Sequence, residues 1–515
     1  MTHRAAMKSP FADQWRKAEQ EEMDSLTSRS VWKLVPRPSN ANIISCKWVY
    51  KTKEDSEGNP VRHKARLVAR GFTQIEGIDY EETFAPTAKF VTIRLIISLA
   101  TSLNWPLEQA DIDTAFLWSE IEEDIFMEQP EGHIDPQHPE FVCKLLKSLY
   151  GLKQAANLWN RLLSKTLKTI GFTQLLTDTS CFIKMDQDGT AVIMAVYVDD
   201  LIIAGRNRAL VKQVINDLKG HFQVKELGPI KWVLGISVDR NLEAGTTIIH
   251  QKKYINDMVT RFGQQDAAPI GLPYAGGDEK QPEEVIACDS KATSLYRSIV
   301  GSLLYAAVAT RPDITETVAR LCRAMQSPNT TDMKKAIRCL RYLKGTADLG
   351  IQYSGSSGLL CYCDSNWGGP LERRLSRTGY AFTLNNGAII FRSLMQKAQA
   401  LSTAEAEYVA LCATTQDGAY LLQMLSEMGI GDNAPITILE DNQACISVGT
   451  KDIVSPKLKH IDIKYHYVRT MVQENKIQIV YCPTYHQAAD ILTKGTDKLT
   501  FLRHRSTLMG LPSRP

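Results

Sequence analysis

The sequence lacks several features that would place the chain in a specialised class. Its 11 cysteines are scattered without a Cys-x-x-Cys pair, and the most closely spaced are Cys361 and Cys363. This pattern excludes a disulfide framework and a zinc site built on paired cysteines, and it favours a reducing compartment. No apolar run is long enough to span a membrane, and the polar opening, 1–10, is not typical of a secretory signal.

The chain also lacks a large net charge of either sign. The 60 basic and 57 acidic side chains leave a formal net charge of +3, which permits nucleic-acid binding without arguing for it. Hydrophobic residues make up 44% and charged residues 23% of the chain, as in ordinary globular proteins. A length of 515 residues therefore predicts about two to four domains, each able to bury a core.

The most informative stretch is 192–205, in which Asp199 and Asp200 interrupt a run of apolar, β-branched residues. Such a run predicts a strand, and carboxylates inside it would be costly to bury. We therefore expect a hairpin in which one strand ends at Val198, the two aspartates form the turn and a second strand begins at Leu201. Carboxylates at its tip suit Mg²⁺, which prefers oxygen ligands. The pattern alone is also typical of an ordinary turn.

A third carboxylate comes from an earlier segment. A short strand is predicted to end at Asp111, after an apolar-striped helix over 92–103, and Asp113 is the local rival for the same role. Together with the Asp-Asp pair, this residue completes the set of carboxylates that a two-metal phosphoryl transferase needs.

Residues 43–72 predict a β-hairpin whose turn, 54–60, is rich in glycine, proline and acidic residues. On its second strand Lys64, Arg66 and Arg70 recur at even spacing, so one face is basic. A solvated sheet face explains this pattern, whereas beside a phosphate-binding site the same face would clamp a triphosphate.

Taken together, these motifs resemble the reverse transcriptase of copia-type long-terminal-repeat retrotransposons, the part of the Pol polyprotein that also carries ribonuclease H. The resemblance runs from about Trp15 to Lys494. Several motifs in the family's order make it specific, and they lie at 64–72, 111–116, 127–132, 148–155, 197–200, 296–301 and 310–314.

The resemblance implies an α+β fold: a right-hand polymerase with fingers, palm and thumb, joined to an α/β ribonuclease H-like domain. It also implies that Asp111, Asp199 and Asp200 hold two Mg²⁺ or Mn²⁺ ions. The residues that it places at the substrates are Lys64, Arg66, Phe116 and Gln154 for the nucleotide and Tyr197, Val198 and Lys153 for the primer and template. An aromatic ring at position 116 would leave no room for a 2′-hydroxyl; a core phenylalanine is the alternative.

Two pairs of neighbouring residues depart from the family pattern. Trp118 and Ser119 stand where the family usually has Asn-Gly, and Ala156 and Asn157 stand where it usually has Pro-Arg. Asn157 in place of a cation predicts a weaker contact with the template backbone.

The last part of the chain carries a second set of acidic residues. Acids follow strands or begin helices in an order that is typical of ribonuclease H, in which four carboxylates hold two metal ions. Helices are predicted to begin at Ser402 or Thr403 and near 443 and 488. The predicted strands are 359–364, 378–384, 388–391, 436–440 and 477–481.

This part also resembles the copia-type family, and the matching carboxylates, which would likewise hold two Mg²⁺ or Mn²⁺ ions, are Asp364, Glu407, Asp441 and Asp490. Two of these assignments involve a choice. Glu407 is preferred to Glu405, which is expected to face solvent, because the residues around Glu407 match the family. Asp441 is preferred to its neighbour Glu440 because it directly precedes a helix.

Composition and motif order together divide the chain. Residues 265–290 are rich in glycine, proline and acids, which favours a linker, and residues 293–347 carry helical apolar stripes. The predicted units are a helical lead-in (1–40), reverse transcriptase (41–264), linker and helical connection (265–355), ribonuclease H-like domain (356–497) and C-terminal tail (498–515).

The sequence therefore predicts an RNA- and DNA-directed DNA polymerase that also cuts the RNA of RNA–DNA hybrids. Its expected partners are an RNA template, a DNA primer, RNA–DNA hybrid and dNTPs, with no membrane. The resemblance further implies work inside a cytoplasmic particle, and a homodimer stays open. The alternative is an inactive or repurposed relic that only binds nucleic acid. Because no protease, integrase or zinc-knuckle sequence is present, we expect a processed product, a truncated copy or a gene fragment.

Overall fold

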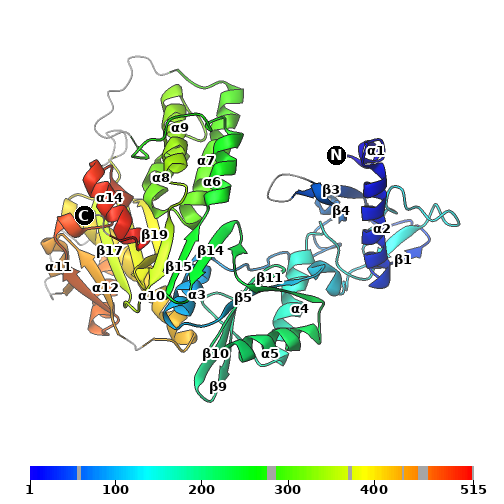
Figure 1. Ribbon diagram of the computed structural model, residues 1–515, viewed down its shortest axis with the longest axis horizontal. Helices are drawn as coiled ribbons and strands as arrows, with labels where there is room; N and C mark the ends of the chain where they lie inside the picture. The colour runs from blue at the N-terminus through cyan, green and yellow to red at the C-terminus, as the bar shows by residue number, and fades with distance from the viewer. Residues whose placement is uncertain (55–59, 275–285, 369–373, 432–433, 451–461, 513–515) are drawn as a thin grey trace.

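The structure, a computed structural model, describes residues 1–54, 60–274, 286–368, 374–431, 434–450 and 462–512. Their strands form five sheets, and their helices cover or connect these sheets. The molecule is elongated, with the first helices at one end and the C-terminal strands and helices at the other (Figure 1). Within these residues, every helix is too short or not apolar enough to cross a membrane.

Two small sheets and one long helix make up the N-terminal end. Its elements are α1 (His3–Ala6), α2 (Ala12–Ser28), β1 (Trp32–Val35), β2 (Ile43–Ile44), β3 (Cys46–Glu54), β4 (Pro60–Ala69), η1 (Gly71–Thr73), β6 (Phe126–Met127) and β7 (Val142–Leu145). Helix α2 packs against β4 with Trp15, Ala18 and Leu26 buried. Strands β3 and β4 form the predicted antiparallel hairpin.

A six-stranded sheet occupies the middle of the molecule. Its strands run in the order β12 (Val224–Pro229), β5 (Leu107–Ile112), β11 (Asp200–Gly205), β10 (Gly189–Tyr197), β9 (Cys181–Asp186) and β8 (Thr173–Gln174). The helices around it are α3 (Phe90–Ser102), η2 (Ala115–Trp118), α4 (Ala155–Thr169) and α5 (Arg208–Lys219). Ile202 and Ala204 of β11 pack in the core that includes α3, whereas Leu201 and Ile203 pack in the core with α4 and α5. The sheet is buried on both faces, which explains the unbroken apolar run.

The hairpin around the two aspartates is present, with one correction. Strands β10 and β11 pair antiparallel, and Tyr197 is the cross-strand partner of Asp200. The two turn residues are therefore Val198 and Asp199. Asp200 is the first residue of β11 and not part of the turn, because its backbone takes part in the strand ladder.

A four-stranded sheet and four helices connect the middle of the molecule to its C-terminal part. They are β13 (Trp232–Val233), β14 (Ile236–Asn241), β15 (Thr246–His250), α6 (Lys252–Arg261), α7 (Ser290–Ala309), η3 (Pro312–Ile314), α8 (Thr315–Arg323), α9 (Thr330–Gly345) and β16 (Gly350–Ser354). The predicted helical stretch 293–347 thus corresponds to α7, α8 and α9. Part of the predicted linker, 275–285, lies outside the described residues.

The C-terminal part contains a five-stranded sheet. Its order is β19 (Gly387–Met395), β18 (Arg377–Leu384), β17 (Leu360–Asn366), β20 (Ile436–Glu440) and β21 (Ile477–Tyr481), with β17, β20 and β21 parallel. The helices are α10 (Thr403–Glu427), α11 (Gln443–Thr450), α12 (Asp462–Gln473), η5 (Thr484–His486), α13 (Asp490–Thr493) and α14 (Lys498–Met509). Residues 498–509 of the expected tail form α14, which buries Phe501, Leu508 and Met509 and belongs to the packed fold.

The middle and C-terminal parts share one continuous hydrophobic core. Arg94 of α3 crosses this contact, donating hydrogen bonds to the carbonyl of Ile389 in β19 (2.7 Å) and to those of Val308 and Ala309 in α7 (2.8 and 2.9 Å). Its guanidinium also lies 4.6 Å from the ring centre of Phe391. The two parts are therefore packed directly on each other and not merely joined by a linker.

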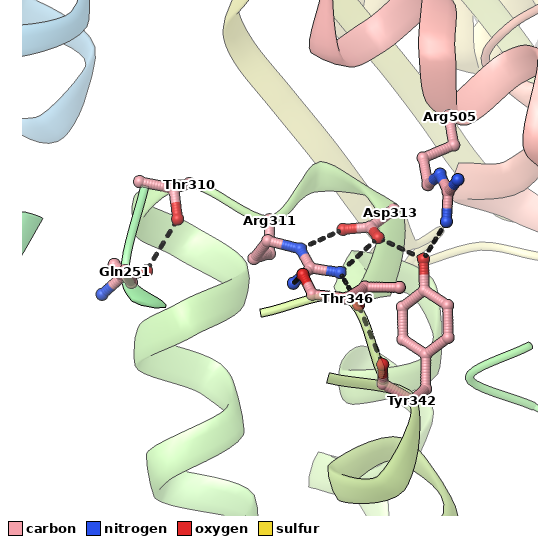
Figure 2. Close-up of polar contacts among 7 residues, drawn as sticks. All are labelled: Gln251, Thr310, Arg311, Asp313, Tyr342, Thr346 and Arg505. Atoms are coloured by element: carbon pink, nitrogen blue, oxygen red, sulfur yellow. Dashed lines mark hydrogen bonds and ion pairs between the residues drawn. The ribbon is translucent and has the colours of Figure 1, made fainter. Parts of the chain in front are cut away.

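A buried polar network ties the connecting helices to α14 (Figure 2). Arg311 and Asp313, both 0% exposed, form a two-pronged ion pair at 2.9 and 2.7 Å. Arg311 also donates to Thr346 at the end of α9, and Asp313 accepts from the Tyr342 hydroxyl. Arg505 of α14 donates to the same hydroxyl at 3.1 Å. Because every partner is fixed by another, the network sets the position of α9 and α14 together.

We expect Asp313→Asn to lower the free energy of unfolding by about 3–5 kcal/mol, because it leaves a buried guanidinium without its counter-charge. Urea unfolding followed by circular dichroism measures the loss. Asp13→Asn, which removes the exposed Arg16–Asp13 pair, is the matched control and should leave the transition unchanged. Equal transitions for the two variants would contradict a supporting role for the network.

Candidate active sites

The first candidate site lies at one end of the middle sheet. Asp111 of β5 is the cross-strand partner of Asp200 in β11, and on its other side it pairs with Lys225 of β12. The amide of Ile112 donates to the carbonyl of Asp199 at 3.0 Å, which holds the turn beside β5. Strand register thus brings together the three predicted aspartates, whereas the rival Asp113 lies beyond the end of β5.

The charges at this end of the sheet repel one another. Burial raises the pKa of Asp111, and the nearby carboxylates of Asp199, Asp200 and Asp113 raise it further, while Lys225 opposes them. Burial and Asp199 also raise the pKa of Asp200, whose Oδ1 accepts a hydrogen bond from Gln109 at 3.1 Å. Partly buried carboxylate oxygens that repel one another fit a divalent cation such as Mg²⁺.

The hairpin tip has a strained backbone. Val198 has a φ of 60°, a left-handed conformation that a β-branched residue rarely adopts. Its carbonyl accepts a hydrogen bond from the indole nitrogen of buried Trp159 at 2.7 Å, which holds the turn against α4. Tyr197 and Val198 are half-buried at this tip, beside the aspartates, where the sequence predicts the primer end.

Arg66 of the N-terminal hairpin packs beside two aromatic rings that lie near the aspartates. The Arg66 guanidinium lies 4.8 Å from the ring centre of Tyr150, and the ring of Phe116 lies 5.2 Å from the same ring. Burial raises the pKa of Tyr150 to about 12, with Arg66 opposing and Asp199 and Asp111 adding to the shift. Lys64 is half-buried two residues before Arg66 on the same strand face. Tyr150 thus joins Arg66 and Phe116 in one cluster close to the aspartates.

One residue predicted to contact the nucleotide, Gln154, makes hydrogen bonds within the protein. The side chain of Gln154 is buried, its amide nitrogen donates to the carbonyl of Asp79 at 2.7 Å, and its oxygen accepts from Gln74 at 3.1 Å. Its polar atoms are therefore occupied inside the protein, where they hold the 74–79 loop against the start of α4. Lys153, beside it, is exposed. Asn157, predicted to weaken a template contact, donates to the carbonyl of Phe84 at 2.6 Å.

The second candidate site lies on the C-terminal sheet. Among the described residues, one group of three acidic side chains brings an oxygen from each within 4.8 Å of the other two: Asp364, Glu407 and Asp441. Asp364 lies inside β17 and not at its end, Glu407 lies in the second turn of α10, and Asp441 follows β20. Asp490, on α13, lies close enough to raise the pKa of Asp364, and Asp441 in turn raises the pKa of Asp490.

Burial dominates the electrostatics of this second site. It raises the pKa of Asp364, Glu407 and Asp490, and repulsion from neighbouring carboxylates adds to each shift. One oxygen of Glu407, Oε2, is buried without a hydrogen-bond partner, and so is Oε2 of Glu440. Buried acceptor oxygens that lack donors fit hard divalent cations, which take carboxylate ligands.

Two acidic residues in this region are buried, which the sequence did not predict. Glu405 is buried and not exposed to solvent, and its carboxylate accepts a hydrogen bond from the amide of Leu401 at 2.7 Å. Ser402, the N-cap of α10, in turn accepts from the amide of Glu405. The Ser-x-x-Glu spacing was a signal for this capping arrangement. Glu440 is fully buried beside the site, and no local signal distinguished it.

Comparison with known proteins shows similarity to reverse transcriptases and to transposon proteins. A family model described as "Reverse transcriptase (RNA-dependent DNA polymerase)" matches residues 29–275. The chain is 37% identical over 497 residues to the retrovirus-related Pol polyprotein from transposon TNT 1-94 of Nicotiana tabacum, covering 96% of this chain and 37% of that protein. It is 32% identical to a transposon Ty5-1 protein of Saccharomyces cerevisiae over 60% of this chain and 99% of that one.

A solved structure supports the fold. The foamy viral protease–reverse transcriptase in complex with double-stranded DNA aligns with 91% of this chain and 70% of its own, with a TM-score of 0.50 and 11% identity. The chain spans a little over a third of the length of the curated polyproteins that it matches. The chain thus belongs to the family of retrotransposon Pol polyproteins that carry this reverse transcriptase, as its copia-type motifs predict.

Proposed function

We propose that this chain is an RNA- and DNA-directed DNA polymerase that also cleaves the RNA strand of RNA–DNA hybrids. The observation that carries the proposal is the placement of two acidic clusters on separate sheets. One cluster lies near Tyr150, which packs against Arg66 and Phe116, and the other is closely packed and largely buried. The proposed partners are an RNA template, a DNA primer, RNA–DNA hybrid and dNTPs.

At the polymerase site, Asp111, Asp199 and Asp200 are the residues that would hold two Mg²⁺ or Mn²⁺ ions. Ions bound there would activate the primer hydroxyl and stabilise the leaving oxygen. Lys64 and Arg66 would bind the triphosphate, since cations on one strand face match its charge and spacing. Val198 and Tyr197, on the strained hairpin tip, would contact the primer end, and exposed Lys153 would contact the template.

At the ribonuclease H site, Asp364, Glu407, Asp441 and Asp490 are the residues that would hold two Mg²⁺ or Mn²⁺ ions. Their buried and mutually repelling oxygens support this assignment, because the carboxylates gain most from a cation where water is excluded. The hybrid would be held mainly through its backbone charge and A-like shape.

A glycine in β18 lets α13 lie close to the sheet, beside the strand that bears Asp364. Gly379 of β18 is the cross-strand partner of Asp364. A Cβ on this glycine would lie 2.5 Å from Cγ2 of Thr493 and 3.0 Å from the carbonyl carbon of Leu492. Because the backbone of α13 would have to move, this glycine is required for Asp490 to reach the site.

The proposal is tested by measuring two activities on the same chain. Primer extension on an RNA template should fall by about 1000-fold or more in Asp199→Asn/Asp200→Asn, with hybrid cleavage retained. Asp364→Asn/Asp441→Asn should show the reverse. Each double variant is the control for the other, because it leaves the second site intact. Hybrid binding without either activity in the unchanged chain would favour the relic instead.

We expect Phe116→Val to weaken discrimination against ribonucleotides by about 10- to 200-fold, because a smaller side chain leaves room for the 2′-hydroxyl. Single-nucleotide incorporation with paired dNTP and rNTP measures the ratio. If Phe116 is only a core residue, both incorporation rates should fall together and the ratio should stay constant.

We also expect Gly379→Ala to reduce hybrid cleavage by about 100-fold, since displacement of α13 moves Asp490 away from Asp364. Primer extension should not change. Gly358→Ala is a matched control in the same part of the chain, because a Cβ there would meet nothing within 4 Å. Normal cleavage by the Gly379 variant would show that the close approach of α13 at this glycine is not required.

A further inference from the structure

A single ammonium group lies at one side of the C-terminal acidic cluster. Lys494 directly follows α13, and its Nζ lies 2.8 Å from Oδ1 of Asp490 and 3.9 Å from Oδ2 of Asp364. The Lys494 side chain is 37% exposed, whereas those of Asp490 and Asp364 are 6% and 3% exposed. A flexible, partly solvated cation thus lies against two buried carboxylates.

The two sides of the cluster differ. On the side of Glu407 and Glu440, one carboxylate oxygen of each residue is buried without a hydrogen-bond partner. On the side of Asp490, Oδ1 likewise has no hydrogen-bond partner, but the Lys494 ammonium lies beside it as a counter-charge, and the hydroxyl of Thr493 donates to Oδ2 of Asp364. Among the described residues, Glu407 and Glu440 thus have no cation beside them, whereas Asp490 and Asp364 already have one.

We propose that Lys494 occupies the place of the second metal ion between Asp364 and Asp490 until nucleic acid binds. Without substrate, the cluster then takes one divalent ion, at Asp364, Glu407 and Asp441, and the second ion binds only with the hybrid. This inference rests on the ribonuclease H function proposed above. It adds that Lys494 is a positioning residue: because of Lys494, the second metal ion binds only when substrate is present.

The physical reason is competition between cations. An ammonium and a divalent ion at the same two carboxylates repel each other strongly where water is scarce. A scissile phosphate offers the lysine another anionic partner, and its exposed side chain has the freedom to move toward it. The hybrid therefore releases the two carboxylates at the moment when the second ion is needed.

The inference is tested by Mn²⁺ binding without nucleic acid, measured by isothermal titration calorimetry. The full chain carries Asp111→Asn, Asp199→Asn and Asp200→Asn throughout, so that the polymerase site does not contribute. With Lys494 present, we expect one bound Mn²⁺ per chain. Lys494→Met should bind a second Mn²⁺ at least about tenfold more tightly than the protein with Lys494 does.

Further variants serve as controls. Lys494→Gln repeats the test if the methionine variant folds poorly, and Lys494→Arg, which keeps the charge, should still bind one ion. Lys476→Met removes an exposed lysine paired with Glu474 on the same part of the chain and should change nothing.

Two outcomes separate the inference from the function on which it rests. Equal Mn²⁺ stoichiometry and affinity with and without Lys494, both lost on Asp364→Asn, would overturn the role of Lys494 while keeping the metal site. Mn²⁺ binding that survives Asp364→Asn would instead count against the ribonuclease H site itself.

Discussion

The position of the first acidic cluster depends on strand register. The β5–β11 pairing places Asp111 opposite Asp200, and a slip by one residue would turn every side chain of a strand to the other face. Such a slip would exchange Leu201 and Ile203, which pack on one side, with Ile202 and Ala204, which pack on the other. Because both cores are closely packed, the fit of these particular side chains opposes the slip and keeps the carboxylates in place.

Both acidic clusters bring carboxylates close enough to repel one another. Each cluster raises the pKa of its own members through burial and like charge, and cations lie close to each: Lys225 beside Asp111, and Lys494 beside Asp364 and Asp490. Close packing keeps the acids in place in spite of this repulsion. In the C-terminal part, Gly379 permits the close approach of α13, and Thr493 binds Asp364 directly.

The two parts of the molecule share a core, so the two acidic clusters are held on one continuous body. Arg94 is buried in this contact, where burial lowers its pKa to about 10 and three backbone carbonyls accept its hydrogen bonds. The network of Arg311, Asp313, Tyr342 and Arg505 adds a second connection, between the connecting helices and α14. A hybrid that reaches both sites would therefore meet them at a fixed spacing.

Local pattern was enough to predict some elements from the sequence. The apolar runs predicted the strands around the aspartates, helical spacing predicted α7 to α9, and the resemblance to the family predicted the carboxylates of both clusters. Tertiary structure decided what depends on distant partners: Asp200 belongs to the ladder, Gln154 is bonded inside the protein, Glu440 is fully buried and residues 498–509 form a packed helix. The physical reason is that burial and pairing arise between residues far apart in the chain, and a local pattern carries no record of which distant atoms will meet.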